Sequence, residues 1–265
     1  MGVYLKAAVG ALPGAGRLPF VAGGGGALPD LELDDPAACA DTDRVAEYAR
    51  VCGFRLRDEL PPTYPHVVAF PLHMRLMTDG SFPFSPVGLV HVANRIEVRR
   101  PLRAGDALDL RVRPAEHEAE RAFTIVTEAR AEGELAWREE STMLRRGDGH
   151  APRELEDFDG DFVSRWHLPD DLGRRYAGVS GDRNPIHMHS LTAKAFGFPR
   201  AIAHGMWTKA RCLAALEPAL LGAYTVEVEF RKPILLPSRV DFERSGERFR
   251  VRSGDKVHLL GLIRE

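Results

Sequence analysis

The sequence predicts an α+β fold built from two similar modules in tandem, each with a helix wrapped by a curved antiparallel sheet. Three observations support this. The chain has 265 residues, enough for two packed modules of roughly 130 residues each. Two short patterns recur about 130 residues apart. In each copy, helical patterns precede a run of alternating strands, which is typical of an α+β layout.

The recurring patterns suggest a duplicated domain. The segment YARVCGF (48–54) resembles YAGVSGD (176–182), and VRRPL (98–102) resembles FRKPI (230–234). This spacing is too long for a solenoid repeat. We therefore predict a Gly/Pro-rich arm over 1–29, a first module over 30–146, a linker over 147–161 and a second module over 162–265.

Apolar spacing of i, i+3, i+4 and i+7 predicts a short helix at the start of each module. The positions are Val45, Tyr48, Ala49 and Cys52 in the first module, and Leu172, Tyr176 and Val179 in the second. A largely apolar helix is predicted over 205–216. Its first turn leaves backbone N–H groups without an intrahelical acceptor.

Strands with alternating apolar residues follow the helices in both modules. The inward-facing positions are predicted to be Ile96/Val98, Leu108/Leu110/Val112 and Phe123/Ile125 in the first module, and Val226/Val228/Phe230, Val240/Phe242, Phe249/Val251 and Val257/Leu259 in the second.

Composition narrows the class of protein. Hydrophobic residues make up 44% and charged residues 28%, so a full core is available, and a net charge of −2 gives no basic excess for nucleic acid. The three cysteines, Cys39, Cys52 and Cys212, form no C-x-x-C pair, so we expect no disulfide framework and a reducing cytoplasm. No apolar run approaches the ~20 residues of a membrane span, and we expect no signal peptide.

The polar stretch VSGDRNPIHMHS (179–190) is the strongest candidate for a site. Pro185 favours an extended conformation at Asn184, so the chain bends there. Asp182 and His187 can then converge on one water molecule and act as an acid–base pair near neutral pH. Asn184 can orient that water without titrating.

Two other interpretations of this stretch remain open on the residues alone. Asp182 and Asn184 are also common turn residues, and His187 could cap a helix. A metal site would combine His187 and His189 with Asp182 and His204, although no helical H-x-x-x-H spacing supports it.

A second element, AIAHGM (201–206), precedes the long helix of the second module. Gly205 at the helix N-terminus can present its backbone N–H to a developing oxyanion, assisted by the helix dipole. The alternative is that a helix–strand crossing needs a small residue there. His204 is expected to be structural when considered alone.

Together, SGDRNPIH (180–187), AFGF (195–198) and IAHGM (202–206) resemble the (R)-specific enoyl-CoA hydratases, also called hydratase 2 or MaoC-like dehydratases. The resemblance covers about 170–236 directly. It implies a double hot dog, in which two fused modules each have a long central helix wrapped by an antiparallel sheet. It also implies reversible hydration of a trans-2-enoyl thioester to the (R)-3-hydroxyacyl thioester, without a metal or redox cofactor.

The resemblance assigns roles to positions of this chain. Asp182 and His187 would be the acid–base pair, Asn184 a polar support and the Gly205 N–H the oxyanion donor. Substrate-binding positions are then expected at Ser180, Pro185, Ile186, His204, Met206, Arg231 and Lys232. Arg231 and Lys232, like Arg99 and Arg100, could meet phosphates of CoA or of an acyl carrier protein, although charges at strand ends are usually only solvated. Whether the double hot dog forms a homodimer stays open.

The first module departs from the family pattern. Aligning the repeats puts Phe54 where Asp182 stands and Glu59 near the place of His187. The first module is therefore predicted to be degenerate and non-catalytic, with one active site per chain. Segments 63–65 and 70–72 are expected to shape the acyl tunnel, unless they only fill the core.

Two other functions compete with a hydro-lyase. A hot-dog thioesterase would need a hydrolytic group against the thioester carbonyl. A protein that binds acyl chains or acyl carrier protein without catalysis would have no need of the Asp182/His187 pair.

Overall fold

The computed structural model describes residues 27–84, 86, 89–116, 122–145, 154–220 and 222–265. Most of the predicted N-terminal arm (1–26) and much of the predicted linker (147–153) lie outside the described residues.

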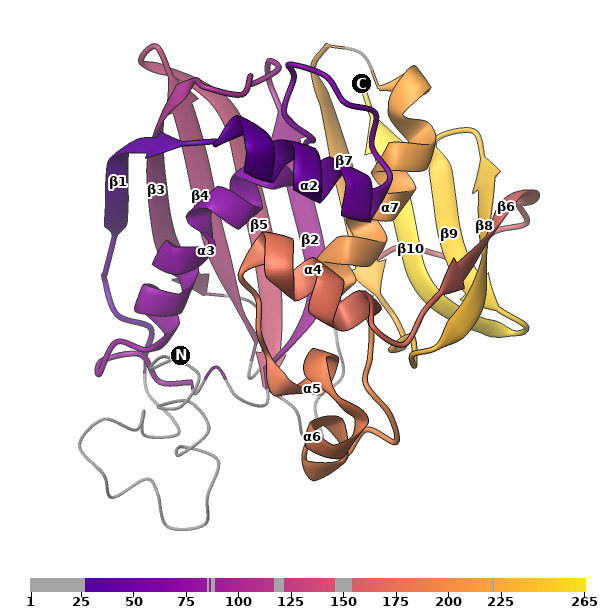
Figure 1. Ribbon diagram of the computed structural model, residues 1–265. Helices are drawn as coiled ribbons and strands as arrows, with labels where there is room; N and C mark the ends of the chain where they lie inside the picture. Colours follow the sequence, from indigo (N-terminus) through magenta and orange to yellow (C-terminus); the bar gives the residue numbers. More distant parts are fainter. Residues whose placement is uncertain (1–26, 85, 87–88, 117–121, 146–153, 221) are drawn as a thin grey trace.

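One antiparallel sheet of ten strands runs through the described chain in the order β1-β3-β4-β5-β2-β7-β10-β9-β8-β6 (Figure 1). The strands are β1 (Leu33–Cys39), β2 (Leu89–Val98), β3 (Ala107–Glu116), β4 (Ala122–Ala131), β5 (Glu134–Arg145), β6 (Asp161–Leu168), β7 (Tyr224–Phe230), β8 (Ser238–Ser245), β9 (Arg248–Ser253) and β10 (Lys256–Arg264).

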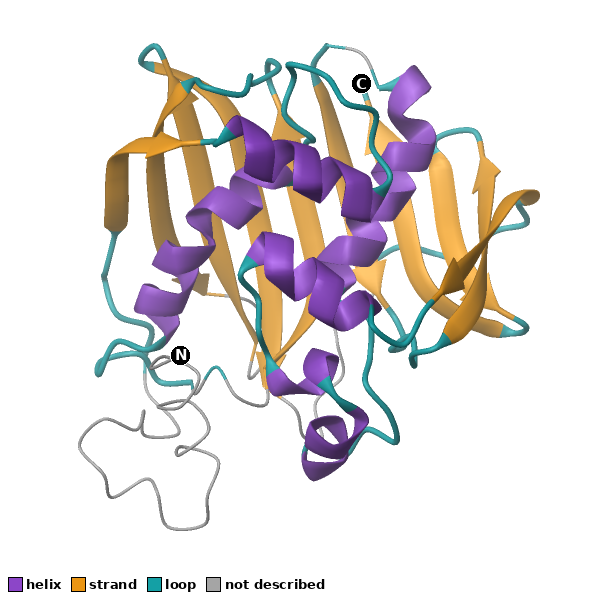
Figure 2. Ribbon diagram, viewed as in Figure 1, coloured by secondary structure: helices purple, strands orange, loops and turns teal. Residues whose placement is uncertain are grey.

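The helices cover one face of this sheet (Figure 2). They are α2 (Thr42–Cys52), α3 (Tyr64–Met77), α4 (Leu172–Ser180), α5 (Pro185–Met188), α6 (Ser190–Ala195) and α7 (Gly205–Leu216), which a 3-10 turn (Glu217–Ala219) extends. The apolar side chains of the sheet and of the two long helices, α3 and α7, form one large buried cluster between these layers.

The strand order is symmetric about the middle of the sheet, where β2 pairs with β7 antiparallel over Ala93–Val98 and Tyr224–Glu229. Loop hydrogen bonds repeat as well. The Leu60 N–H donates to the carbonyl of Leu102, and the Ala203 N–H donates to that of Ile234. Two copies of one helix-and-sheet unit are thus joined edge to edge, which is the double hot dog. The domain boundaries themselves stay a prediction.

The short helices α2 and α4 end in the same way. Gly53 and Gly181 follow them with φ of 85° and 78°, a left-handed conformation that favours glycine. The two helices pack together, with the Tyr48 and Tyr176 rings 6.0 Å apart. The repeated Tyr and Gly positions therefore have a structural cause, which is one helix and its cap used twice.

The long helix of the first module, α3, is the element that the residue patterns did not locate. Pro65 lies in its first turn, where a missing N–H costs nothing, and Pro71 lies inside it. The segment is apolar on most sides because it is buried, so it shows no clear amphipathic period. By contrast, the helix predicted over 205–216 is confirmed as α7.

Two finer expectations are wrong. Glu59 does not take the place of His187: it bridges to Arg103 as Ile202 bridges to Leu235, so Glu59 corresponds to Ile202. The first module simply lacks a counterpart of the segment that carries α5 and α6. Val257 and Leu259 do not share a face, because a bulge between them shifts the register of β10 against β9.

The other predicted inward positions of the strands are buried or partly buried as expected. The three cysteines are free, with Cys39 exposed and Cys52 and Cys212 buried. Among the described residues, no helix is long and apolar enough to cross a membrane.

Candidate active site

The polar stretch 179–190 is folded around the end of α4 and the short helix α5. After the left-handed Gly181, the Asn184 N–H donates to Asp182 Oδ1 (3.1 Å) and tightens the bend. Asn184 is extended, with φ −55° and ψ 127°, as expected before Pro185. Its side chain accepts from the Ile186 N–H and caps α5. Asn184 and Asp182 thus serve as turn and cap residues, and the stretch is partly helical.

Asp182 and His187 converge from the two sides of this bend. Their functional atoms and a ring nitrogen of His204 all lie within 4.8 Å of one another. Close packing of α4 on α5 makes this approach possible, because Gly173 leaves space for the backbone carbonyl of His187. His189, in contrast, is exposed and lies outside this group.

The hydrogen bond of His187 determines its tautomer. Its Nδ1 lies 2.8 Å from the backbone carbonyl of Ile202, an acceptor, so Nδ1 carries the proton. In the neutral ring, Nε2 then keeps a lone pair and can accept a proton. Burial lowers the pKa of His187, partly opposed by the Asp182 carboxylate. The neutral form therefore dominates near neutral pH.

His204 supports this pair. Its ring stacks on that of His187 with centroids 3.7 Å apart, and its Nε2–H donates to the backbone carbonyl of Asp182 (3.0 Å). Burial lowers the pKa of His204 to about 3, so the ring stays neutral. The side chain thus fixes both members of the pair in position, in keeping with a structural role.

Gly205 begins α7 immediately after His204 and lines the same cavity. A Cβ at this position would lie 3.1 Å from the ring of Phe230, so a close approach of helix and strand also favours glycine here. Its N–H belongs to the first turn, which has no intrahelical acceptors. The steric and the oxyanion interpretations of Gly205 are therefore compatible.

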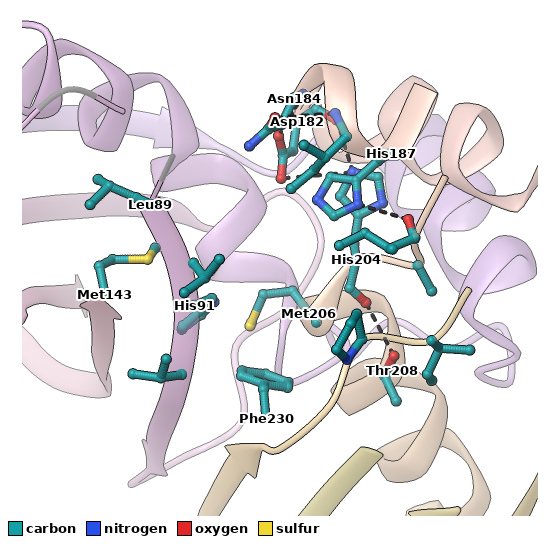
Figure 3. A pocket seen from close by; sticks show the side chains of 18 of the residues that line it. Leu89, His91, Met143, Asp182, Asn184, His187, His204, Met206, Thr208 and Phe230 are labelled. Carbon is teal, nitrogen blue, oxygen red and sulfur yellow. Dashed lines mark hydrogen bonds and ion pairs between the residues drawn. The ribbon is translucent and has the colours of Figure 1, made fainter. Parts of the chain in front are cut away.

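These groups face a cavity of about 660 Å³, a volume typical of small-molecule sites. Figure 3 shows Asp182, Asn184, His187 and His204 at one end, with Met206, Phe230 and His91 further along. All the predicted site residues line it: Ser180, Asp182, Asn184, Pro185, Ile186, His187, His204, Gly205, Met206, Arg231 and Lys232.

The basic residues differ in their surroundings. Arg231 is largely buried, forms an ion pair with Glu229 and donates to the carbonyl of Leu155. Lys232 is exposed at the cavity. Arg99 pairs with Glu97, and neither Arg99 nor Arg100 is among the residues lining this cavity. If phosphate is bound at strand ends, Lys232 is the residue best placed for it.

The first module supplies a second wall that residue patterns did not identify. His66, His73 and Met74 of α3 and His91 of β2 line the cavity, together with Phe70. In the segments expected to shape a tunnel, Phe70 lines the cavity, whereas Tyr64 and Leu72 belong to the core. The spacing of seven between His66 and His73 was the available signal, since it places both on one side of a helix.

Comparisons with known proteins agree with these observations. A family model described as a MaoC like domain matches residues 160–259. The chain is 36% identical over 243 residues to 3-hydroxyacyl-thioester dehydratase X of Mycobacterium tuberculosis, covering 88% of this chain and 84% of that protein. It is 29% identical over 188 residues to the enoyl-CoA hydratase ChsH3 of the same organism, covering 63% of this chain and 64% of that protein.

The fold is also similar to a solved structure. The crystal structure of HtdX from M. tuberculosis superposes with a TM-score of 0.79 at 33% identity, over 88% of this chain and 99% of that one. The similarity therefore extends over both modules and includes the segment that carries the site. The chain belongs to the MaoC-like dehydratase family.

Proposed function

We propose that this chain is a hydro-lyase that interconverts trans-2-enoyl thioesters and (R)-3-hydroxyacyl thioesters, carried on CoA or on acyl carrier protein. The observation that carries the proposal is the approach of Asp182 to His187 inside a cavity that also contains the N-terminus of α7. The names of the relatives, a 3-hydroxyacyl-thioester dehydratase and an enoyl-CoA hydratase, support the same reaction class.

The arrangement suits hydration. Water held between Asp182 and His187 adds its oxygen to the β-carbon while the Nε2 atom of His187 accepts its proton. The electron pair of the double bond moves towards the thioester carbonyl, and the Gly205 N–H stabilises the resulting oxyanion by roughly 3–4 kcal/mol. Return of the proton from His187 to the α-carbon completes the addition. Asp182 orients the water and stabilises the imidazolium.

The direct test follows the conjugated enoyl-thioester absorbance when the protein is mixed with crotonyl-CoA and with a longer enoyl-CoA. We expect loss of absorbance and formation of the (R)-3-hydroxyacyl product. Release of free thiol in place of hydration would indicate a thioesterase. No hydration of any chain length by folded protein would contradict the proposal.

The acid–base pair has its own test. Asp182→Asn keeps the Oδ1 acceptor for the Asn184 N–H, so the bend is retained while the charge is lost. We expect kcat to fall by about 10²–10⁴. Asp170→Asn is the matched control, because Asp170 is an exposed carboxylate outside the cavity. A fully active Asp182→Asn variant refutes the assignment. Stoichiometric zinc in the active protein would revive the metal interpretation of Asp182, His187 and His204.

A further inference from the structure

The cavity wall from the first module carries a buried polar network. The Nδ1–H of His66 on α3 donates to Glu139 Oε2 on β5 (2.8 Å). The Asn94 amide of β2 donates to Glu139 Oε1 (2.8 Å) and to Ser141 Oγ (3.0 Å). Lys209 of α7 donates to the side chain and the carbonyl of Asn94. Both Glu139 oxygens and the Asn94 side chain are satisfied within the network, which links the central helices of the two modules.

His91 lies beside this network but is not part of it. Its ring is 6.5 Å from that of His66 and 5.0 Å from that of Phe230. The Nε2 atom of His91 is buried and has no hydrogen-bond partner among the described residues. A buried polar atom without a partner is costly, so the network does not explain why a histidine stands here.

A bulge in β2 turns His91 towards the cavity. Asn94 faces inward opposite Ser141, and strict alternation would place Val92 inward and His91 outward. The register shifts at this point, so that His91 lies opposite Met143, two residues from Ser141 and on the same face. Val92 instead packs in a small separate apolar cluster with Ala122 and Leu144.

His91 lies where it would contact the acyl chain of a substrate and not the reacting double bond. Phe230 lies between His91 and Gly205: its ring contacts the Cβ position of Gly205 and tilts against the ring of His91. In Figure 3, His91 and Met143 lie on one side of Met206, His187 and His204 lie on the other, and Asp182 lies above it. A substrate whose thioester lies at Gly205 can therefore extend its chain towards His91.

The charges on the cavity wall from the first module favour a neutral group on the substrate. Burial lowers the pKa of His73 and of His91 to about 3, so both rings are neutral near neutral pH. Glu139 carries the nearby negative charge: its hydrogen bonds and the His66 ring hold its pKa near 2 despite burial. A neutral oxygen can hydrogen-bond with His91 without bringing a further charge into this region, which is apolar and in which the charge of Glu139 is already compensated.

We propose that His91 forms a subsite for a hydroxyl group on the acyl chain of the thioester substrate. This inference rests on the proposed function for the site that it extends. A plain alkyl chain would fill the cavity and leave the Nε2 atom without a partner, whereas a hydroxyl at the matching carbon would donate to it once the ring turns this covered atom towards the cavity. His91 is then a specificity-determining residue contributed by the non-catalytic module.

The test uses a series of medium-chain trans-2-enoyl-CoA substrates in which one hydroxyl is moved along the chain, beside the plain chain of equal length. We expect one position at which the wild-type protein prefers the hydroxylated substrate by about tenfold in kcat/KM, equivalent to about 1.4 kcal/mol. His91→Leu should bring this ratio close to one, and His91→Gln, which keeps hydrogen-bonding atoms, should retain part of it.

His167→Leu is the matched control, since it removes an exposed histidine outside the cavity and should keep the wild-type ratio. The ratio of kcat/KM for the hydroxylated and the plain substrate is insensitive to partial loss of folded enzyme, because such a loss lowers both values equally. If His91→Leu does not fold, the wild-type series and His91→Gln still decide. The absence of any preference in the wild type, or an equal preference in His91→Leu, overturns the subsite.

The experiments distinguish failure of the proposed function from failure of the His91 subsite. Hydration of crotonyl-CoA together with no preference for a hydroxylated chain would refute the subsite and leave the proposed function standing. If no enoyl-CoA is hydrated, calorimetric binding of hydroxylated against plain saturated acyl-CoA tests the subsite by itself, with tighter binding of the hydroxylated chain supporting it and equal binding overturning it.

Discussion

Gly173 has no side chain, and this allows α4 to pack closely on the bend that carries Asp182 and His187. It is the second residue of α4, and a Cβ built on it would lie 1.9 Å from the backbone carbonyl oxygen of His187 and 2.9 Å from the carbonyl carbon. The obstacle is backbone, which cannot rotate away as a flexible side chain could. Substitution Gly173→Ala therefore forces α4 and α5 apart.

The size of the effect follows from that contact. Ordinary van der Waals contact begins near 3.4 Å, so about 1.5 Å of separation must be found. We expect a loss of about 1–3 kcal/mol in the free energy of unfolding, as for other overpacked sites. Because His187 is carried on the displaced segment, we also expect kcat/KM to fall by about 10²-fold, the cost of a misplacement of about 1 Å.

Gly178→Ala is the matched control in the same helix. A Cβ at Gly178 would have no atom within 4 Å, and replacing a helical glycine by alanine stabilises by about 0.5–1 kcal/mol. The assays are urea unfolding and hydration of crotonyl-CoA for both variants. If Gly173→Ala matches Gly178→Ala in stability and in kcat/KM, the reasoning from the helix contact is refuted.

Three further outcomes are expected. Because burial lowers the pKa of His187 from its usual 6.5, the acid limb of the kcat/KM profile should be centred below pH 6.5; an acid limb centred above 6.5 would contradict this. Burial lowers the pKa values of His73, His91 and His204 from 6.5 to about 3 in the folded protein. The stability that these neutral rings contribute, measured by urea unfolding, should therefore be fully present above pH 6.5. It should be lost from there towards pH 3, by up to about 1.4 kcal/mol per pH unit for each histidine, and a flat profile would count against buried neutral rings. Glu139→Ala should lower the free energy of unfolding by about 3–5 kcal/mol. It leaves the buried donors of His66 and Asn94 without their acceptor and removes the carboxylate that favours the charged form of the buried Lys209. Glu140→Ala, a partly exposed neighbour, should cost at most about 1 kcal/mol, and equal losses would refute the difference.

The half of the candidate site that comes from the second module was predictable because its residues are close in sequence. Asp182, Asn184 and His187 lie within one bend, and a proline and a following helix make their convergence a local matter. Gly205 was predictable for a similar reason, since a glycine at the start of an apolar helix marks a free backbone N–H. None of these inferences needed a contact between distant segments.

The first module was harder to interpret. Its long helix α3 contains Pro71 and is buried on most sides, so neither propensity nor periodicity indicated a helix. Glu59 does not correspond to His187 because the first module lacks the α5–α6 segment, which the repeated patterns do not reveal. Only the bridges to Arg103 and Leu235 identify the equivalent positions.

The sequence by itself determined the α+β class, the repeated helix-then-strands order and the convergence of Asp182 and His187 within one segment, because these depend on neighbours along the chain. Only the tertiary structure decided that His66, His73 and His91 of the first module share a cavity with Asp182 and His187 of the second. That meeting depends on the pairing of β2 with β7 and on a bulge that reverses the direction of His91. A strand's facing residues change with a single shift of register, and the shift at His91 is visible only in the pairing of β2 with β5.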